Sequence, residues 1–513
     1  MLLRLAFTGL LLLATCVTVH AADPTAAEAR QTLLKAVKFA HEQVARHGGY
    51  VYLSSSDLTL REAEGIPDND TIWVQPPGTP AVGEALLRAY QATGDETCQR
   101  ALDAAARSLS RGQLHSGGWY YSVHFAPEVR KTIAYRRDLS GKLLPDPTAA
   151  ADRQSTNGWL DWKRRRHKGN ITTYDDDVTQ SATRFLMRVD AEKKFQDEEI
   201  HDAALYSLRA MIGAQYPSGG WSSSWDRFPD RSPSAEVFPI KKAELPATVS
   251  EKWPKDFTGC YVLNDNQMSN CIETLLLAYD IYQDEKYLAA AKKAGDFLIL
   301  AQLPEPQAVW AQQYDEQMRP CWCRAFEPPA ATGGETQKII LSLISLYEVT
   351  QDKKYLAPIP AALAYLQKSE LPGGKLARFY ELRTSRPIYF ERGPGGKGHV
   401  WTYDDKSIAD GYGYIVSSNL PALQRKYQAA LKLDFTNKTA AKTAAKKPDI
   451  PAAEPVQVAM KSIDGRGAWT EKGTIRDATG KKVDPPGGII RSETFIKNLD
   501  VLSRYVHAHR ENE

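Results

Sequence analysis

The sequence predicts an all-α fold: an (α/α) toroid of repeated helical hairpins, with long loops on one face that form a substrate groove. Two patterns predict this architecture. A polar turn followed by apolar residues at helical spacing recurs along the chain, at 92–109, 189–215, 281–302 and 349–367. Each copy follows another amphipathic segment, such as 79–90 or 335–347, so the chain is expected to form a series of helix pairs.

A Gly-Gly pair marks the end of these helix pairs. It stands at 48–49, 117–118, 219–220 and 373–374. Glycine adopts the left-handed conformation that ends a helix at no steric cost, so each pair predicts a helix end followed by a loop. Because the glycines recur at the same place in the repeat, we expect the long loops on one face of the ring.

The predicted loops are rich in aromatic and charged residues. Examples are "GGWYYSVHF", "GGWSSSWDRF" and "VWAQQYD". Aromatic rings stack on sugar faces while charged groups bind hydroxyls or carboxylates, so this mixture indicates a polysaccharide groove. We therefore expect Trp221, Trp310 and Tyr314 to bind substrate. The alternative is that some of these rings only wedge neighbouring loops together.

Composition and charge exclude two classes of partner. The 513 residues carry a formal net charge of +3, which is too small for an extended nucleic-acid footprint. The basic run at 163–168 is expected to be a solvated loop. After residue 21, no apolar run reaches the about 18 residues that a membrane helix needs. We expect a monomer with no nucleic-acid partner and no membrane span.

Residues 1–21 have the layout of a secretory signal peptide. They contain one arginine, an apolar run and a small-x-small ending at Val19 to Ala21. The mature chain is therefore expected to begin near Ala22 and to be secreted or periplasmic. A lipidated Cys16 is the alternative, but Thr15 is a poor residue directly before a lipidated cysteine.

Composition also divides the rest of the chain. We expect residues 22–435 to form the catalytic toroid, 436–457 an Ala/Lys/Pro-rich linker, and 458–513 a C-terminal segment whose closing helix packs on the body. Cys321 and Cys323 could suggest zinc. However, no second pair of ligands stands nearby to complete the set of four that a structural site needs.

Two stretches place acidic and amide side chains directly before a helical pattern. Asp175 to Asp177 precede one helix, and Asn264 to Asn266 precede another at the matching place of a later repeat. Either group could simply cap its helix, which stabilises by about 1 kcal/mol. Aspartate-rich motifs also occur in toroids that cyclise terpenes, but those enzymes need a closed apolar cavity and these loops are polar. For Asp175 and Asp176 we expect helix capping and an ordered rim.

From Thr173 to Tyr347 the chain resembles the family 10 pectate lyases, which are α-helical toroids that cleave polygalacturonate. The resemblance rests on an ordered set of motifs: "TYDDDVTQSATRFLMRV", "AQYPSGGW", "YVLNDNQMSN", "AVWAQQYD" and "CRAFEPPAATGGET". It resumes in "LARFYELRTSRPIYF". The chain departs from the family pattern with Asn266 in place of an acid, with Tyr314 in place of a histidine, and in "YFERGPGGKG" after the arginine-proline segment.

The resemblance implies a calcium-assisted β-elimination. Such an enzyme removes the proton next to the uronate carboxylate and expels the oxygen on the neighbouring carbon, and a divalent cation neutralises the carboxylate while charge builds on it. Ca²⁺ suits this role in exported proteins because it takes several oxygen ligands. Asp265 and Asp315 match acidic positions of the family and are the implied ligands, with Asn264 assisting.

The resemblance also implies that Arg386 is the base. Arginine is protonated in nearly all sites, so Arg386 would need its neutral form only transiently, opposite a proton already acidified by calcium. The alternative is a surface ion pair of Arg386 with Glu381 or Glu391. Arg324 and Arg378 are expected to bind uronate carboxylates in bidentate fashion, or else to tie a loop to the ring.

We therefore expect an exported pectate lyase that acts on polygalacturonate or pectin. One rival is a glycoside hydrolase on the same fold, acting on a uronate-containing polysaccharide with Asp177 and Asp265 flanking the scissile bond. Ultraviolet absorbance separates the two reactions, because only elimination creates a conjugated, unsaturated uronate. The other rival is a non-catalytic polysaccharide-binding protein, which would bind polygalacturonate without creating new chain ends.

Overall fold

The computed structural model describes residues 24–147, 168–229, 235–236, 238–254, 261–435 and 450–510. The predicted signal peptide, the basic run at 163–167 and most of the predicted linker lie outside these ranges. Among the described residues, no helix is both long and apolar enough to cross a membrane.

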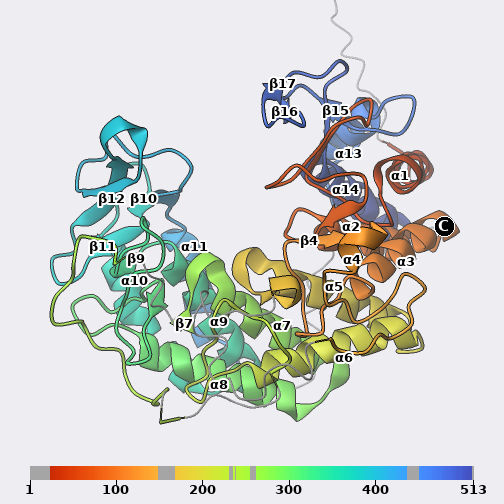
Figure 1. The fold of residues 1–513 in the computed structure, drawn as a ribbon. Coiled ribbons are helices and arrows are strands. Elements are labelled where there is room, and N and C mark those ends of the chain that lie inside the picture. The colour runs from red at the N-terminus through yellow and green to blue at the C-terminus, as the bar shows by residue number, and fades with distance from the viewer. Residues whose placement is uncertain are drawn as a thin grey trace, which may run out of the picture.

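Paired helices form a curved ring, which confirms the predicted fold class (Figure 1). Neighbouring inner helices pack on one another in the order α14 (Ser492–His509), α2 (Thr79–Thr93), α5 (Val178–Glu192), α7 (Gln267–Tyr282), α9 (Glu335–Thr350) and α11 (Leu420–Leu431). The outer helices that pack on the first five of these are α1 (Ala26–Phe39), α3 (Glu96–Ser110), α6 (Glu198–Gly213), α8 (Glu285–Ala301) and η6 (Lys353–Leu356) with α10 (Ile359–Lys368).

The polar turn that repeats in the sequence is the connection inside each helix pair. An aspartate side chain caps the outer helix of four pairs by accepting from a backbone N–H group, at Asp95, Asp197, Asp284 and Asp352. The inner helix before it ends at a left-handed residue in three pairs, at Gly94, Gln283 and Gln351. The repeat found in the sequence therefore marks the turn from inner to outer helix.

Short antiparallel strand pairs connect the two ends of each helix pair. A strand before the inner helix pairs with a strand after the outer helix: β3 (Thr71–Trp73) with β4 (Ser122–His124), β5 (Thr172–Thr173) with β6 (Ser224–Trp225), β7 (Tyr261–Val262) with β8 (Gln313–Tyr314), and β9 (Ala330–Thr332) with β11 (Phe379–Glu381). The sequence did not predict these strands, because two or three residues show too little alternation. The strand pairs gather the starts of the inner helices on one side of the ring.

A fully buried tryptophan follows the outer helix in three of the repeats. Each indole Nε1–H donates, over 2.7 to 2.8 Å, to a carbonyl near the end of that outer helix: Trp119 to Leu109, Trp221 to Met211 and Trp310 to Leu298. Tyr314 is buried too, and its hydroxyl donates to Ala301. The prediction that Trp221, Trp310 and Tyr314 bind substrate is therefore wrong for this structure, because no ring face is left for a sugar.

Two of the Gly-Gly pairs also show why glycine is needed. Gly117 and Gly219 have φ of +116° and +107°. A Cβ atom added there would lie 2.1 Å from the Ala210 side chain and 2.0 Å from the Lys293 carbonyl oxygen, respectively. These glycines let one hairpin approach the outer helix of the next, which agrees with their predicted place at the end of a helix pair.

The two ends of the chain together build one unit of the ring. α1 is its outer helix and α14 its inner helix, and they pack on each other. β1 (Leu53–Ser55) follows α1 and pairs with β18 (Ile489–Arg491), which precedes α14. These strands lie in one sheet with β2 (Arg61–Glu62) and β15 (Thr470–Glu471). The closing helix thus packs on the body, as expected.

The predicted boundaries at 435 and 457 do not separate structural units. α13 (Ala453–Ser462) begins inside the predicted linker and packs on α14. α14 in turn contacts α2 along its length, so the C-terminal segment belongs to the same ring as residues 26–431. The Ala/Lys/Pro composition of the predicted linker could not reveal this, because α14 packs on α1 and α2, which lie far from it in the sequence.

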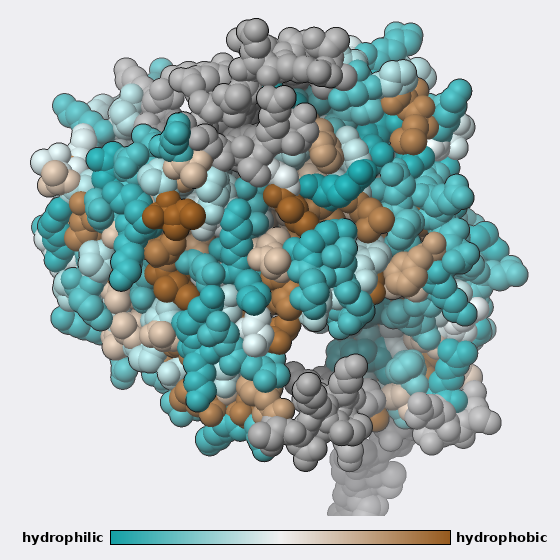
Figure 2. All heavy atoms as spheres, turned by 90° about the horizontal axis from the view of Figure 1, so that it is seen from below, coloured by the Kyte–Doolittle hydropathy of each residue, from teal (hydrophilic) through white to brown (hydrophobic). Residues whose placement is uncertain are grey.

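The remaining elements sit on the loops. The short helices are η1 (Ala40–Val44), α4 (Pro127–Arg130), η3 (Lys168–Asn170), η4 (Asp175–Asp177), η5 (Asn264–Asn266) and η7 (Pro394–Gly396). The other strands are β10 (Lys375–Ala377), β12 (Pro387–Arg392), β13 (His399–Thr402), β14 (Ile415–Ser417), β16 (Ile475–Arg476) and β17 (Lys482–Val483). Seen from below, the surface is mainly hydrophilic, with apolar side chains in small groups (Figure 2).

Candidate active site

Two turns with the same backbone begin two adjacent inner helices. η4 leads into α5, and η5 leads into α7. The middle residues, Asp176 and Asp265, have φ of 49° and 47°, and the third residues, Asp177 and Asn266, both have φ of 61°. Aspartate and asparagine are among the few non-glycine residues that accept this left-handed conformation. Backbone shape therefore explains part of this polar composition.

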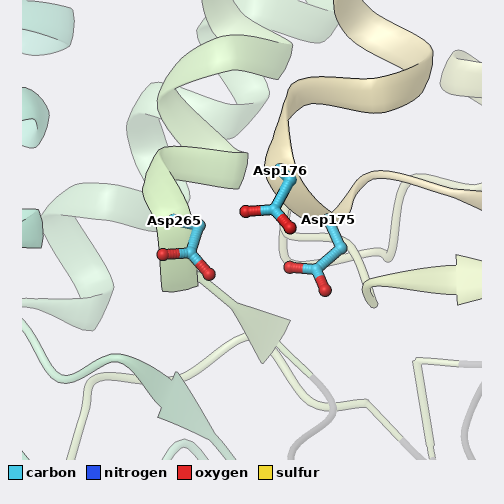
Figure 3. Close-up of side chains that lie close together, drawn as sticks. All are labelled: Asp175, Asp176 and Asp265. Atoms are coloured by element: carbon cyan, nitrogen blue, oxygen red, sulfur yellow. The ribbon is translucent and has the colours of Figure 1, made fainter. Parts of the chain in front are cut away.

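Helix capping does not explain these side chains. The helices α5 and α7 begin without a side-chain capping hydrogen bond, and so do η4 and η5. Asp175 and Asp176 were predicted to act as caps. That expectation is wrong, because their carboxylates point away from the helix ends and toward the neighbouring turn (Figure 3).

The two turns bring three carboxylates together. One oxygen from each of Asp175, Asp176 and Asp265 can be chosen so that all three lie within 4.8 Å of one another. Figure 3 shows that the first two come from the turn before one inner helix and the third from the turn before the next. We call this group the acidic cluster. It forms because both turns expose their middle residue on the same side of the ring.

Burial and neighbouring negative charges make the ionised state of two carboxyl groups in the cluster unfavourable. Burial, then the charges of Asp175 and Asp265, raise the pKa of Asp176 to about 7. Burial, then the charges of Glu335 and Asp175, raise the pKa of Asp265 to about 7, although Arg378 opposes the shift. Like charges at this distance repel, so a proton or a cation between the carboxylates lowers the energy.

The three members of the cluster have different partners. Asp175 accepts a hydrogen bond of 2.7 Å from the Tyr121 hydroxyl. Asp265 lies 3.7 Å from Nη1 of Arg378 and 3.9 Å from Nη2 of Arg324. Within the described ranges, Asp176 has no hydrogen bond or ion pair. Thus Asp175 is held by a hydrogen bond, Asp265 faces two arginines, and Asp176 has no partner among the described residues.

Two arginine–glutamate pairs border the cluster beside Asp265. The Arg324 guanidinium binds Glu327 with two nitrogens, and Arg378 Nη1 lies 3.0 Å from Glu335 Oε1. Burial raises the pKa of Glu327, but its hydrogen bonds with Arg324 outweigh this and hold the pKa below its usual value. The Arg324 side chain is 46% exposed and that of Arg378 is 18% exposed. Both arginines can therefore still meet a ligand.

A buried polar layer supports these pairs. Asn264 accepts from the Gln312 amide and lies 3.4 Å from Glu327, while the Tyr412 hydroxyl donates to Glu327 over 3.1 Å. Two buried atoms of this layer, Oε2 of Glu335 and Oε1 of Gln312, have no hydrogen-bond partner. Asn264 was predicted to assist calcium, but the structure turns its side chain into this layer and away from the cluster.

Asp315, the second predicted calcium ligand, lies outside the cluster. Its carboxylate is 2.8 Å from Arg319 Nη2 and accepts the backbone N–H groups of Gln317 and Arg319. These contacts close a turn after β8. The prediction that Asp315 shares a metal with Asp265 is not met here, because its oxygens are used within its own turn.

Arg386, the predicted base, also lies apart from the cluster. It stands in the turn between β11 and β12, and its guanidinium carbon is 3.6 Å from the centre of the Tyr403 ring. It forms no ion pair with a described residue, so the alternative pairing with Glu381 or Glu391 is absent too. Instead, the Tyr403 hydroxyl donates to Glu381. The arginine of this hairpin that reaches the cluster is Arg378.

Asp177 faces another part of the ring. Its carboxylate forms an ion pair with Arg184 of α5, and both residues line a cavity of about 860 Å³ between the inner helices α2, α5 and α7. Asp177 is therefore not a member of the acidic cluster. The predicted hydrolytic pair of Asp177 and Asp265 is therefore not formed, and the carboxylates of η4 that lie near Asp265 are those of Asp175 and Asp176.

An exposed aromatic ring contacts the tyrosine that binds Asp175. Tyr120 is 38% exposed and packs edge-on against Tyr121, with ring centres 5.0 Å apart. Tyr121 is the residue that donates to Asp175. The aromatic motif of this loop was noted in the sequence, and the structure shows that its Trp119 is buried while its Tyr120 is exposed.

No family model matches this chain, and no curated protein matches it. Among solved structures, a family 10 polysaccharide lyase from Cellvibrio cellulosa is 17% identical, covering 68% of this chain and 98% of the other, with a TM-score of 0.41. A family 76 glycoside hydrolase (mannosidase) from Bacteroides thetaiotaomicron is 12% identical, covering 95% and 100%, with a TM-score of 0.41. A cellobiose 2-epimerase from Bacillus thermoamylovorans is 14% identical, covering 93% and 98%, with a TM-score of 0.41. Likeness at this level decides neither the reaction nor the substrate.

Proposed function

We propose that this protein is a carbohydrate-active enzyme that cleaves an acidic polysaccharide of the polygalacturonate kind by cation-assisted β-elimination. The observation that carries the proposal is the acidic cluster with Arg324 and Arg378 at its edge. Carboxylates without enough counter-charge favour a cation, and arginines with free guanidinium surface favour a carboxylate ligand. A uronate chain with a divalent cation supplies both.

The residues of the cluster fit Ca²⁺. Three carboxylates offer six oxygens, the donor type that calcium prefers, and the described partners leave Asp176 entirely free to bind. Burial first, and neighbouring carboxylates second, raise the pKa of both Asp176 and Asp265, and a bound cation would stabilise their charged forms. When bound, the ion would neutralise a uronate carboxylate and so acidify the neighbouring C–H bond. Asp175, Asp176 and Asp265 would hold it.

The arginines would orient the substrate. Arg378 is fixed from two sides, by Glu335 and by the Gly413 carbonyl at 2.8 Å, so little side-chain entropy is lost when it binds a carboxylate. Arg324 is more exposed and equally fixed by Glu327. Two preorganised cationic side chains beside the cluster would hold a uronate carboxylate in a fixed orientation.

An absorbance assay on polygalacturonate tests this proposal. We expect an unsaturated product that absorbs in the ultraviolet, formed with Ca²⁺ and lost when a chelator removes it. New chain ends without absorbance would contradict elimination. Binding of polygalacturonate without any new chain ends would contradict an enzyme.

Retaining glycoside hydrolysis is the second candidate. It uses two carboxyl groups about 5 to 5.5 Å apart, one of them protonated near neutral pH. Asp176 and Asp265 are close enough for this role, and the pKa of each is raised to about 7. This candidate predicts cleavage that persists in chelator and gives no ultraviolet absorbance, so one experiment separates the two reactions.

A further inference from the structure

A cavity of about 490 Å³ opens directly beside the acidic cluster, between the first turns of α9 and α11. Asp265, Glu335 and Arg378 form one of its walls, so the cavity is continuous with the candidate active site. Lys338 of α9 and Lys426 of α11 line it as well. Its volume lies within the range of sites that bind small ligands.

The two lysines give this cavity an excess of positive charge. Lys426 is exposed and forms no hydrogen bond or ion pair with another described residue. Lys338 lies 3.4 Å from Glu273, and the side chains are 39% and 50% exposed, so solvent weakens that pair. With Arg378, the lining holds three cationic groups against the two carboxylates of Asp265 and Glu335. An anionic ligand is therefore favoured, and more so once a cation neutralises Asp265.

We propose that this cavity is a second uronate subsite, in which Lys338 and Lys426 bind a sugar carboxylate next to the one held at Arg378. The inference rests on the proposed function, since it states the direction in which the same polysaccharide would run from the acidic cluster. Neighbouring sugars of polygalacturonate each carry a carboxylate. A polygalacturonate that runs from the acidic cluster into this cavity would meet cationic side chains at successive sugars. A neutral glycan would form no ion pairs there.

Charge removal on α11 tests the subsite. Lys426→Ala removes a cavity cation, and Arg425→Ala removes an exposed charge from the neighbouring position, which does not line the cavity. The readouts are retardation in native gels that contain polygalacturonate, and kcat and KM on the same polymer. We expect Lys426→Ala to weaken binding roughly two- to fivefold and Lys338→Ala/Lys426→Ala roughly tenfold, with kcat nearly unchanged. Arg425→Ala should match the unmodified protein.

The outcomes of the subsite and of the proposed reaction can be told apart. Equal retardation of Lys426→Ala and Arg425→Ala would overturn the subsite, even if the protein cleaves polygalacturonate. Retardation of the unmodified protein that depends on Lys426, but without cleavage, would support the subsite and contradict the reaction. Weaker retardation of the lysine variants in a gel with a neutral glucan would also overturn it, because the lysines would then not be reading carboxylates.

Discussion

The turns η4 and η5 have nearly the same backbone but different chemistry. Both expose a left-handed aspartate to the same point, with φ of 49° at Asp176 and 47° at Asp265. Around it, η4 carries two further carboxylates, whereas η5 carries two amides. The repeat thus fixes where the middle side chain lies, and the neighbours decide what it can do.

The neighbours divide the cluster into two sides. Asp265 faces Arg378 and Arg324, so its charge is partly compensated. Asp176 lies beside Asp175, and the negative charges that act on it outweigh the opposing charge of Arg324. A ligand that joins the two sides must be cationic toward Asp176 and anionic toward the arginines. A cation with a uronate meets this requirement.

The largest effect should come from Asp265→Asn. The substitution keeps the side-chain shape and tolerates the left-handed backbone, but removes the charge that joins the two sides. We expect kcat/KM with Ca²⁺ to fall by about a hundredfold or more, the scale seen when an electrostatic group of an active site is lost.

Stability should change in the opposite direction. Without Ca²⁺, Asp265→Asn should melt at or above the temperature of the unmodified protein, because repulsion within the cluster is relieved. Asn266→Gly is the control, since glycine fits its φ of 61° and the charge is unchanged. A loss of activity in that control equal to the loss in Asp265→Asn would show that the turn, and not the carboxylate, is required.

Next in size is the difference between Arg378→Lys and Arg386→Lys. Arg378 touches Asp265 and Glu335, so lysine should lose the planar contacts and reduce kcat/KM by roughly ten- to a hundredfold. Arg386 stacks on Tyr403 away from the cluster, so Arg386→Lys should leave kcat within about twofold. A larger fall in kcat for Arg386→Lys than for Arg378→Lys would restore Arg386 as the base.

The pH dependence of stability tests whether the carboxyl groups of Asp176 and Asp265 have raised pKa values. The pKa of Asp176 and of Asp265 is about 7 when folded, against a usual 3.8, so the folded state binds more protons than the unfolded state between these values. The free energy of unfolding without Ca²⁺ should therefore fall as the pH rises from about 4 to 7. Melting in chelator between pH 5 and 8 measures this.

Calcium should reverse that trend, because it binds the deprotonated cluster. Its affinity should rise with pH up to about 7 and then level off, as titration calorimetry would show. In Asp176→Asn, both the fall in stability and the rise in affinity should be smaller. Affinity independent of pH in the unmodified protein would contradict the cluster as the calcium site.

The smallest effect should come from Tyr120→Ala. Its exposed ring packs on Tyr121, which binds Asp175 of η4, and stacking on a sugar is expected to contribute about 1 kcal/mol. KM for polygalacturonate should rise roughly fivefold, with kcat unchanged. Tyr121→Phe makes the complementary test: it keeps the ring but frees Asp175 from its hydrogen bond, so it should change calcium affinity more than KM.

The helix pairs and their turns were predictable because they rest on local chemistry. The aspartates that start four of the outer helices and the glycines at the helix-pair ends act through the backbone within a few residues. The equivalent turns at Asp175–Asp177 and Asn264–Asn266 were recognised for the same reason. Neither stretch could reveal that the two helix starts lie side by side. Asp175 and Asp176 were therefore predicted to cap a helix, although they belong to the acidic cluster.

The errors at the site share a physical cause. Trp221 follows a Gly-Gly pair and Trp310 lies in the corresponding loop of the next repeat, yet each indole donates to a carbonyl near the end of its outer helix. Composition says that a ring is in a loop, but not which face of the loop it occupies. Similarly, Arg378 and Arg386 are separated by one short hairpin, and only the pairing of β11 with β9 and β12 decides which reaches the cluster.

The shared terminal unit makes the last helix of the chain the partner of the first. During synthesis, α1 emerges long before its inner partner α14, so this unit of the ring can form only once α14 has been made. The Tyr505 hydroxyl donates to the Pro24 carbonyl, which places the two ends together. A circular permutant that joins α14 directly to α1 and opens the chain at an exposed turn elsewhere would contain the same ring, yet complete this unit early.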